Sequence, residues 1–164
     1  GLHFSAGLLS SLKQNGIGIA TVTLHVGAGT FRTLGSENLD SGELHPEPYW
    51  VSQRAVDAIE KTKQAGGRVL AVGTTVTRCL ESAAVGGLGE KNGTTRLFIR
   101  EGHPFQVIDG LLTNFHLPCS SLLMLVCAFG GRERVMAAYR HAIDGDYSFY
   151  SYGDAMLLWG QCQA

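Results

Sequence analysis

Apolar segments of strand length alternate with segments of helical pattern along this chain, and this alternation restricts its fold more than any other sequence feature. Segments rich in Val, Ile, Leu and Thr predict strands, at residues 17–26, 68–72, 95–99, 105–108 and 155–159. The predicted helices cover residues 5–16, 52–64, 76–84, 119–129 and 132–143. Strands that alternate with helices are typical of α/β domains. We therefore expect an α/β fold, in which a mixed or largely parallel sheet is flanked by helices in three α/β/α layers.

The size and charge of the chain exclude several classes of protein. Its 164 residues fit one domain of ordinary size. A hydrophobic fraction of 45% with only 16% charged residues excludes a disordered chain. The 13 Lys and Arg residues are balanced by 14 Asp and Glu residues, which excludes a strongly basic nucleic-acid binder of the histone kind. RNA binding through a local patch stays open.

The four cysteines indicate a reducing compartment. They stand at positions 79, 119, 127 and 162, so neither a CxxC zinc pattern nor a small disulfide framework is present. The longest apolar run, residues 122–129, is far shorter than the roughly 20 residues that a membrane span needs. We therefore expect a cytoplasmic protein that does not contact membranes. His116 and Cys119 form at most half of a metal site, and no metal is expected.

Two glycine-rich segments follow predicted strands. Gly27 and Gly29 are spaced by one residue after the first strand, which lets the backbone approach a ligand closely. The dinucleotide fingerprint fails, because Arg32 occupies its third glycine position. A tight turn explains this first segment equally well.

The second segment, residues 72–75, lies between a predicted strand and a predicted helix. Its hydroxyls, on Thr74 and Thr75, stand where helix N–H groups can hold an anionic or polar ligand, and Arg78 follows one turn later. The alternative is that one threonine only caps the helix. In that interpretation Arg78 forms a surface pair with Glu81.

Further polar and aromatic residues gather in three other segments. Residues 109–118 contain Asn114, Phe115 and His116, and Phe115 has the shape to stack on a flat base. A core phenylalanine and a histidine with satisfied hydrogen bonds are the alternatives. Residues 147–154 are dense in aromatic and hydroxyl groups, which suit either a nucleobase or the bracing of a loop. The long loop predicted at residues 27–48 supplies His45 and Glu47 as acid or base groups.

Taken together, these segments resemble one family, the S-adenosylmethionine:tRNA ribosyltransferase-isomerases of the queuosine pathway. The matching strings are GLHF at the start, VTLHVGAGTF at 22–31, HPE at 45–47, AVGTT at 71–75, DGLLTNFHLP at 109–118 and SYGDAMLL at 151–158. Family members are about twice as long. The resemblance therefore implies that residues 1–164 form the C-terminal part of the family's α/β domain, without its N-terminal portion and its inserted small β-barrel domain.

The resemblance also implies an unusual reaction. S-adenosylmethionine, as co-substrate, gives its ribosyl carbons to 7-aminomethyl-7-deazaguanine at the wobble position of a tRNA. The product is epoxyqueuosine, and adenine and methionine are released. The implied candidates for proton transfer are His25, His45, Glu47 and His116. The implied substrate-binding residues are Gly27, Gly29, Thr30, Phe31, Gly73, Thr74, Thr75, Arg78, Asn114, Phe115, Tyr152 and Asp154.

Some positions depart from the family pattern. Gly42 replaces a histidine, and Cys119 replaces the lysine of an LPKS segment, which removes a cation from a place where phosphate or carboxylate can be held. Together with the missing N-terminal portion, the loss of this lysine leads us to expect that this chain alone is inactive. A non-catalytic module that binds a nucleoside or RNA is the alternative function.

Overall fold

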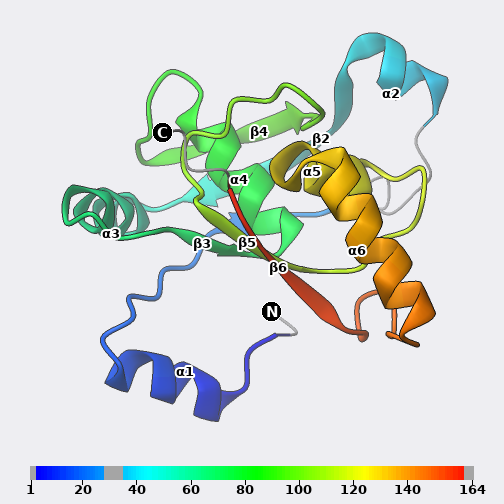
Figure 1. Ribbon diagram of the computed structural model, residues 1–164. Coiled ribbons are helices and arrows are strands. Elements are labelled where there is room, and N and C mark those ends of the chain that lie inside the picture. The colour runs from blue at the N-terminus through cyan, green and yellow to red at the C-terminus, as the bar shows by residue number, and fades with distance from the viewer. Residues whose placement is uncertain (1–2, 28–34, 161–164) are drawn as a thin grey trace.

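In the computed structural model, which describes residues 3–27 and 35–160, six strands form two three-stranded sheets (Figure 1). The first sheet is antiparallel, in the order β1-β2-β4, with bounds Thr23–Leu24, Glu43–Val51 and Lys91–Leu97. The second sheet has the order β3-β5-β6, with bounds Leu70–Val72, Gly110–Asn114 and Ala155–Trp159. In the second sheet β3 is parallel to β5, whereas β6 is antiparallel to it.

Six helices accompany these strands in the described residues. They are α1 (Ala6–Gln14), α2 (Ser36–Ser41), α3 (Gln53–Gln64), α4 (Thr74–Ala84), α5 (Ser121–Gly130) and α6 (Arg132–Asp144). Serine side chains cap α1, α3 and α5, where Ser5, Ser52 and Ser120 each accept a hydrogen bond from a backbone N–H of the first turn. The predicted helix starts at Ser5 and near Ser52 are confirmed. No helix in the described ranges is both long and apolar enough to cross a membrane.

Helix α4 connects the two sheets. It packs against β1, β2 and β4 of the first sheet and against β3 and β5 of the second, and Figure 1 shows it at the centre of the molecule. Cys79 and Ala83 belong to the core cluster of the first sheet, while Leu80 and Ala84 belong to that of the second. The second cluster also receives side chains from α5 and α6. The α/β class and the helices flanking a mixed sheet are thus confirmed.

Two predicted strands and one predicted loop are corrected. The strand expected at residues 17–26 is limited to Thr23–Leu24. The loop expected at residues 27–48 contains α2 and most of β2. β2 escaped the prediction because Pro46 and Pro48 lie inside it and because its pairing shifts register between Glu43 and Glu47, which breaks the alternation of buried and exposed residues.

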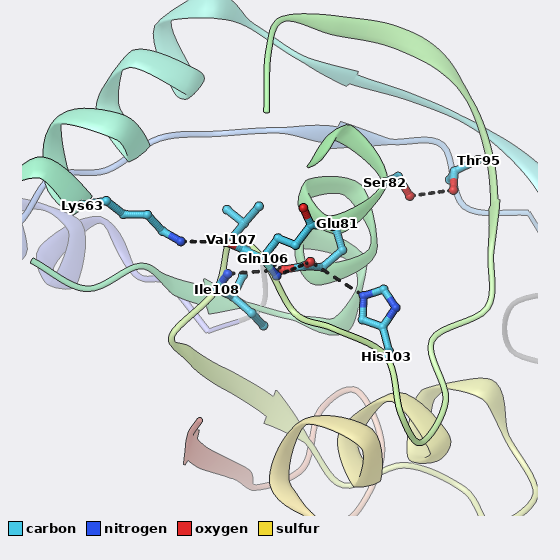
Figure 2. Close-up of polar contacts among 8 residues, drawn as sticks. All are labelled: Lys63, Glu81, Ser82, Thr95, His103, Gln106, Val107 and Ile108. Carbon is cyan, nitrogen blue, oxygen red and sulfur yellow. Dashed lines mark hydrogen bonds and ion pairs between the residues drawn. The ribbon is translucent and has the colours of Figure 1, made fainter. Parts of the chain in front are cut away.

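The segment at residues 105–108 is not a strand, and the physical reason is a buried carboxylate. The Glu81 side chain accepts hydrogen bonds from the backbone N–H groups of Gln106, Val107 and Ile108, at 2.9, 3.0 and 3.3 Å. Figure 2 shows the carboxylate facing this segment from α4. The amides that a neighbouring strand would use are therefore occupied by a side chain.

Candidate functional site

The carboxyl ends of the parallel strands β3 and β5 bring two of the sequence motifs together. The backbone N–H of Gly73, which follows β3, donates to the carbonyl oxygen of Leu112 in β5 at 2.8 Å. Gly73 has a φ of 101°, a backbone conformation that favours glycine. It is also the N-cap of α4, so Thr74 is the first helical residue. The alternative interpretation, in which Thr74 or Thr75 only caps the helix, is therefore wrong. In open α/β sheets this edge is where ligands bind.

A buried ion pair lies one turn further along α4. Arg78 Nη1 lies 2.7 Å from Glu47 Oε2, and their side chains are 3% and 2% exposed. The other carboxylate oxygen of Glu47 accepts a hydrogen bond from the backbone N–H of Gly27 at 2.7 Å. Glu47 therefore ties α4 to the backbone of Gly27, three residues after β1. The surface pair of Arg78 with Glu81 is wrong, since Glu81 is 1% exposed and binds the 106–108 segment instead.

His116 is held at the end of β5 by two polar contacts. Its Nε2 lies 2.8 Å from Thr113 Oγ1, and its backbone N–H donates to the Tyr139 hydroxyl at 2.7 Å. Burial lowers the pKa of His116 to about 4. The imidazole is therefore neutral at pH 7, where it can exchange hydrogen bonds or accept a proton but carries no charge for an anion.

Asn114 fixes the loop that carries the exposed tyrosine. Its Nδ2 donates to the carbonyl oxygens of Gly153 and Asp154, at 3.1 and 3.2 Å. The Asp154 carboxylate accepts a hydrogen bond from the backbone N–H of Ser148 at 2.8 Å. Tyr152, between these anchors, is 93% exposed. The loop is thus braced on the end of β5 and presents an aromatic ring to solvent.

Phe115 takes the core position that was the alternative to base stacking. It is 3% exposed. Its ring centroid lies 5.1 Å from that of Tyr139, 6.0 Å from that of Tyr147 and 5.0 Å from that of Phe149. These rings occupy the surroundings of Phe115, so in this structure it packs against protein rather than presenting a face to a ligand.

The two remaining histidine candidates lie on the surface of the first sheet. The side chains of His25 and His45 are exposed, and the backbone N–H of His25 donates to the carbonyl oxygen of Pro48 at 2.8 Å. Of the neighbouring residues Glu47 and Pro48, Glu47 is buried and Pro48 is exposed. The partner of His25 is therefore the exposed residue, Pro48. Gly29, Thr30 and Phe31 lie outside the described residues.

The sequence analysis missed the buried role of Glu81, whose contacts are drawn in Figure 2. Besides its three amide contacts, its Oε2 lies 3.7 Å from His103 Nε2. Burial alone would raise the pKa of Glu81, but the nearby His103 side chain and the hydrogen bonds from the three backbone amides lower it below its usual value. Lys63 Nζ donates to the carbonyl oxygen of Gln106 at 2.8 Å and holds the same segment from α3. The only sign of this role in the sequence was an acidic residue within a predicted helix, which does not by itself indicate a buried carboxylate.

The candidate site residues that the structure describes fall mainly into two groups, which differ in their chemistry. One group, around Gly27, Glu47 and Arg78, orders backbone near a buried ion pair. The other, at the ends of β3 and β5, offers hydroxyl, amide and neutral imidazole groups beside a helix N-terminus, which suits a ligand with several hydroxyls. Among residues 3–27 and 35–160, no three His, Cys, Asp or Glu side chains are grouped so that they could hold a metal ion.

Comparisons with known proteins agree with one another. A family model described as "Queuosine biosynthesis protein" matches residues 1–158. A protein of Pelotomaculum thermopropionicum named S-adenosylmethionine:tRNA ribosyltransferase-isomerase is 52% identical over 160 residues, which cover 96% of this chain and 47% of that protein. A protein of Halothermothrix orenii with the same name is 54% identical, with the same coverage.

A solved structure is also similar. It is described as the crystal structure of S-adenosylmethionine tRNA ribosyltransferase from Thermotoga maritima, and it matches with a TM-score of 0.79 at 42% sequence identity. The match covers 94% of this chain and 49% of that one. The chain therefore spans about half the length of the relatives it matches.

Proposed function

The chain belongs to the family of queuosine biosynthesis proteins, and from this premise we propose that it supplies the C-terminal part of a tRNA-modifying transferase and isomerase. The observation that carries the proposal is identity of 52% to 54% over 96% of the chain to relatives named S-adenosylmethionine:tRNA ribosyltransferase-isomerase. The proposed co-substrate is S-adenosylmethionine, the proposed partner is tRNA, and the proposed compartment is the cytoplasm.

The proposed reaction moves the ribosyl group of S-adenosylmethionine onto 7-aminomethyl-7-deazaguanine at the tRNA wobble position and isomerises it to give epoxyqueuosine. Such a reaction needs a base, an acid near the leaving adenine and a polar cradle for ribose hydroxyls. The ends of β3 and β5 suit the cradle, with Gly73, Thr74, Thr75 and Asn114 as its members. Tyr152, which is exposed, is proposed to stack on a base, and the Asp154 carboxylate supports its loop.

The geometry divides the four candidates for proton transfer. His116 is neutral at pH 7 and partnered by Thr113, so it is proposed as an acceptor of a proton or hydrogen bond. Glu47 has both carboxylate oxygens engaged, by Arg78 and by the Gly27 amide. It is therefore proposed as a positioning residue that holds the backbone at Gly27. His25 and His45 are exposed and stay candidates for a proton-transferring acid or base.

The proposal is tested with a chimera, because this chain spans about half of its relatives. The half of the Thermotoga maritima relative that this chain does not match is fused ahead of Gly1. Conversion of S-adenosylmethionine and precursor tRNA is followed by mass spectrometry of adenine and epoxyqueuosine. We expect turnover by the chimera and none by the chain alone. In the chimera, His116→Ala lowers kcat, whereas Leu39→Ala on the exposed side of α2 leaves it unchanged.

The second candidate function is a module that binds a nucleoside or RNA without turnover. It is favoured by Cys119, which is exposed and stands where the family pattern has a lysine. Calorimetry of the chain with S-adenosylmethionine and with precursor tRNA separates the two functions. A folded chimera that binds both ligands but forms no epoxyqueuosine, beside an active relative, would establish the binding module and reject the enzyme.

A further inference from the structure

One face of the second sheet carries a continuous set of apolar side chains. In the pairing of β3, β5 and β6, Leu70 lies beside Gly110 and Trp159, and Val72 lies beside Leu112 and Leu157. Paired residues point to the same side of a sheet. These five apolar residues, Leu70, Val72, Leu112, Leu157 and Trp159, are called the open face below.

Gly110 confirms that the open face is contiguous. A Cβ added at Gly110 would lie 2.7 Å from the Trp159 ring and 3.0 Å from Leu70 Cδ1. The side chains of Leu70 and Trp159 therefore meet over Gly110 and join the two outer strands into one apolar surface. A glycine is needed at this position because any side chain would displace them.

The two faces of this sheet differ in their exposure to solvent. On the other face, Ala71, Leu111 and Met156 are each 8% exposed or less, and Leu158, which pairs with Leu111, is partly buried against the same core beneath α4 and α5. On the open face, Leu70 is 42%, Trp159 40% and Leu157 51% exposed. Sheets with parallel strands are normally covered on both faces. An apolar surface left open in this way marks an interface.

Helix α1 has the same character. It has no buried residue, and Leu8 is 43% exposed, although Leu8, Leu9 and Leu12 share one side of the helix. In Figure 1, α1 lies apart from both sheets. A nine-residue helix of this kind is marginal in water without tertiary packing. A second apolar surface of the described chain therefore also lacks cover.

We propose that the open face is the docking surface for a polypeptide equivalent to the half of the relatives that this chain does not match. The relatives have about as much additional chain as they share with this one, since 96% of this chain covers 47% of theirs. The open face is apolar, and the guanidinium beside it, that of Arg68, lies 4.1 Å from the centre of the Trp159 ring. Such a surface suits a protein core better than the phosphates of RNA. The proposal rests on family membership and not on the proposed reaction.

The test is co-expression of this chain with the tagged, unmatched half of the Pelotomaculum relative. We expect the two polypeptides to co-purify in a one-to-one complex. Hydrogen exchange of residues 70–72, 110–114 and 155–159 should slow in the complex by at least tenfold relative to the chain alone. Leu157→Asp should weaken the complex at least tenfold. Leu39→Asp, the same change at a leucine on α2 with 48% exposure, should not.

Each other outcome overturns the proposal. Failure to co-purify, or a complex in which the three strands exchange as fast as before, shows that this half does not cover the open face. Self-association of the chain that Leu157→Asp abolishes, without binding of the other half, assigns the face to a second copy. Circular dichroism of both variants confirms that they fold, and the hydrogen-exchange comparison needs no variant at all.

Discussion

Arg78 and Glu47 form an ion pair of 2.7 Å that is almost fully excluded from solvent, and it joins α4 to β2. Because Glu47 also accepts the Gly27 amide, three segments depend on the same carboxylate. Two charges taken out of water are tolerated only when they are paired and hydrogen-bonded. The pair therefore controls both the packing of α4 and the placement of the backbone at Gly27.

Removal of the Arg78 charge should destabilise the chain strongly. Arg78→Met keeps most of the side-chain volume but leaves the Glu47 carboxylate without its cation. We expect the free energy of unfolding to fall by about 3–5 kcal/mol, measured by urea denaturation at pH 7. The control is Arg96→Met, since the Arg96–Glu43 pair is 3.7 Å long and both side chains are more than half exposed. That change should cost less than about 1 kcal/mol, and equal losses for the two variants would contradict the argument.

Glu81→Gln should destabilise the chain at pH 7 and flatten its response to acid. An amide group turned toward the N–H groups of residues 106–108 leaves at least one of them without an acceptor, at a cost of about 1–3 kcal/mol. The pKa of Glu81 is lower in the folded chain than in the unfolded one. Its stabilising contribution is therefore complete above the usual pKa of about 4.3 and is lost as the pH falls through the lower folded value.

Urea denaturation between pH 7 and pH 3 measures this difference. The gap between the unmodified chain and Glu81→Gln should narrow as the pH falls, because protonation removes the same carboxylate. Glu60→Gln, at an exposed position of α3, should follow the unmodified chain throughout. A constant gap would show that Glu81 does not titrate with folding.

His116 should make the folded chain less stable in mild acid. Its pKa is lowered from 6.5 to about 4 by burial, so between these values the unfolded chain binds more protons than the folded one. The free energy of unfolding should therefore decrease as the pH falls from 6.5 to 4. NMR titration of the imidazole in the folded chain should give a midpoint near 4. His116→Gln should remove this part of the pH dependence, and a midpoint near 6.5 would contradict the buried position.

The cysteines should differ widely in their reactivity. Burial raises the pKa of Cys79 to about 11, and the residue has no exposed surface, so its thiol stays protonated and shielded. Cys119 is exposed. Among the three cysteines in the described residues, peptide mass spectrometry after treatment with iodoacetamide at pH 8 should show Cys119 modified first and Cys79 modified only after unfolding. Cys127 is half-buried with a raised pKa, chiefly from burial, and should react at an intermediate rate. Modification of Cys79 in the folded chain would show that α4 opens locally.

Local signals predicted the elements whose causes are local. Ser5 and Ser52 cap their helices with their own side chains, and the strand at residues 155–159 has the predicted bounds. Where the cause lies elsewhere in the chain, the pattern misled. Residues 105–108 are as apolar as a strand, yet the partner of their amides is Glu81, 25 residues or more away. β2 likewise depends on pairing with β4, which tolerates the prolines that argue against a strand.

The candidate site divides in the same way. Sequence motifs proposed Gly73, Asn114 and His116 as candidates because glycine, amide and imidazole groups at strand ends are recognisable in short windows. The pairing of Arg78 with Glu47 spans 31 positions, and no short window contains both residues. The surface partner chosen for Arg78 was the acid nearest along the helix, whereas burial in the folded chain selected the acid on a neighbouring strand.

Helix α4 sets the spacing between the two sheets through the sizes of its side chains. Cys79 and Ala83 on one side and Leu80 and Ala84 on the other differ in direction by about 100° per residue, and each pair fills a different core. The small residues at positions 79, 83 and 84 let both sheets approach the helix closely. A bulkier side chain at one of them would push a sheet outward and separate the Glu47 segment from the end of β5. The distance between the two groups of polar residues thus depends on the small side chains at positions 79, 83 and 84, which belong to neither group.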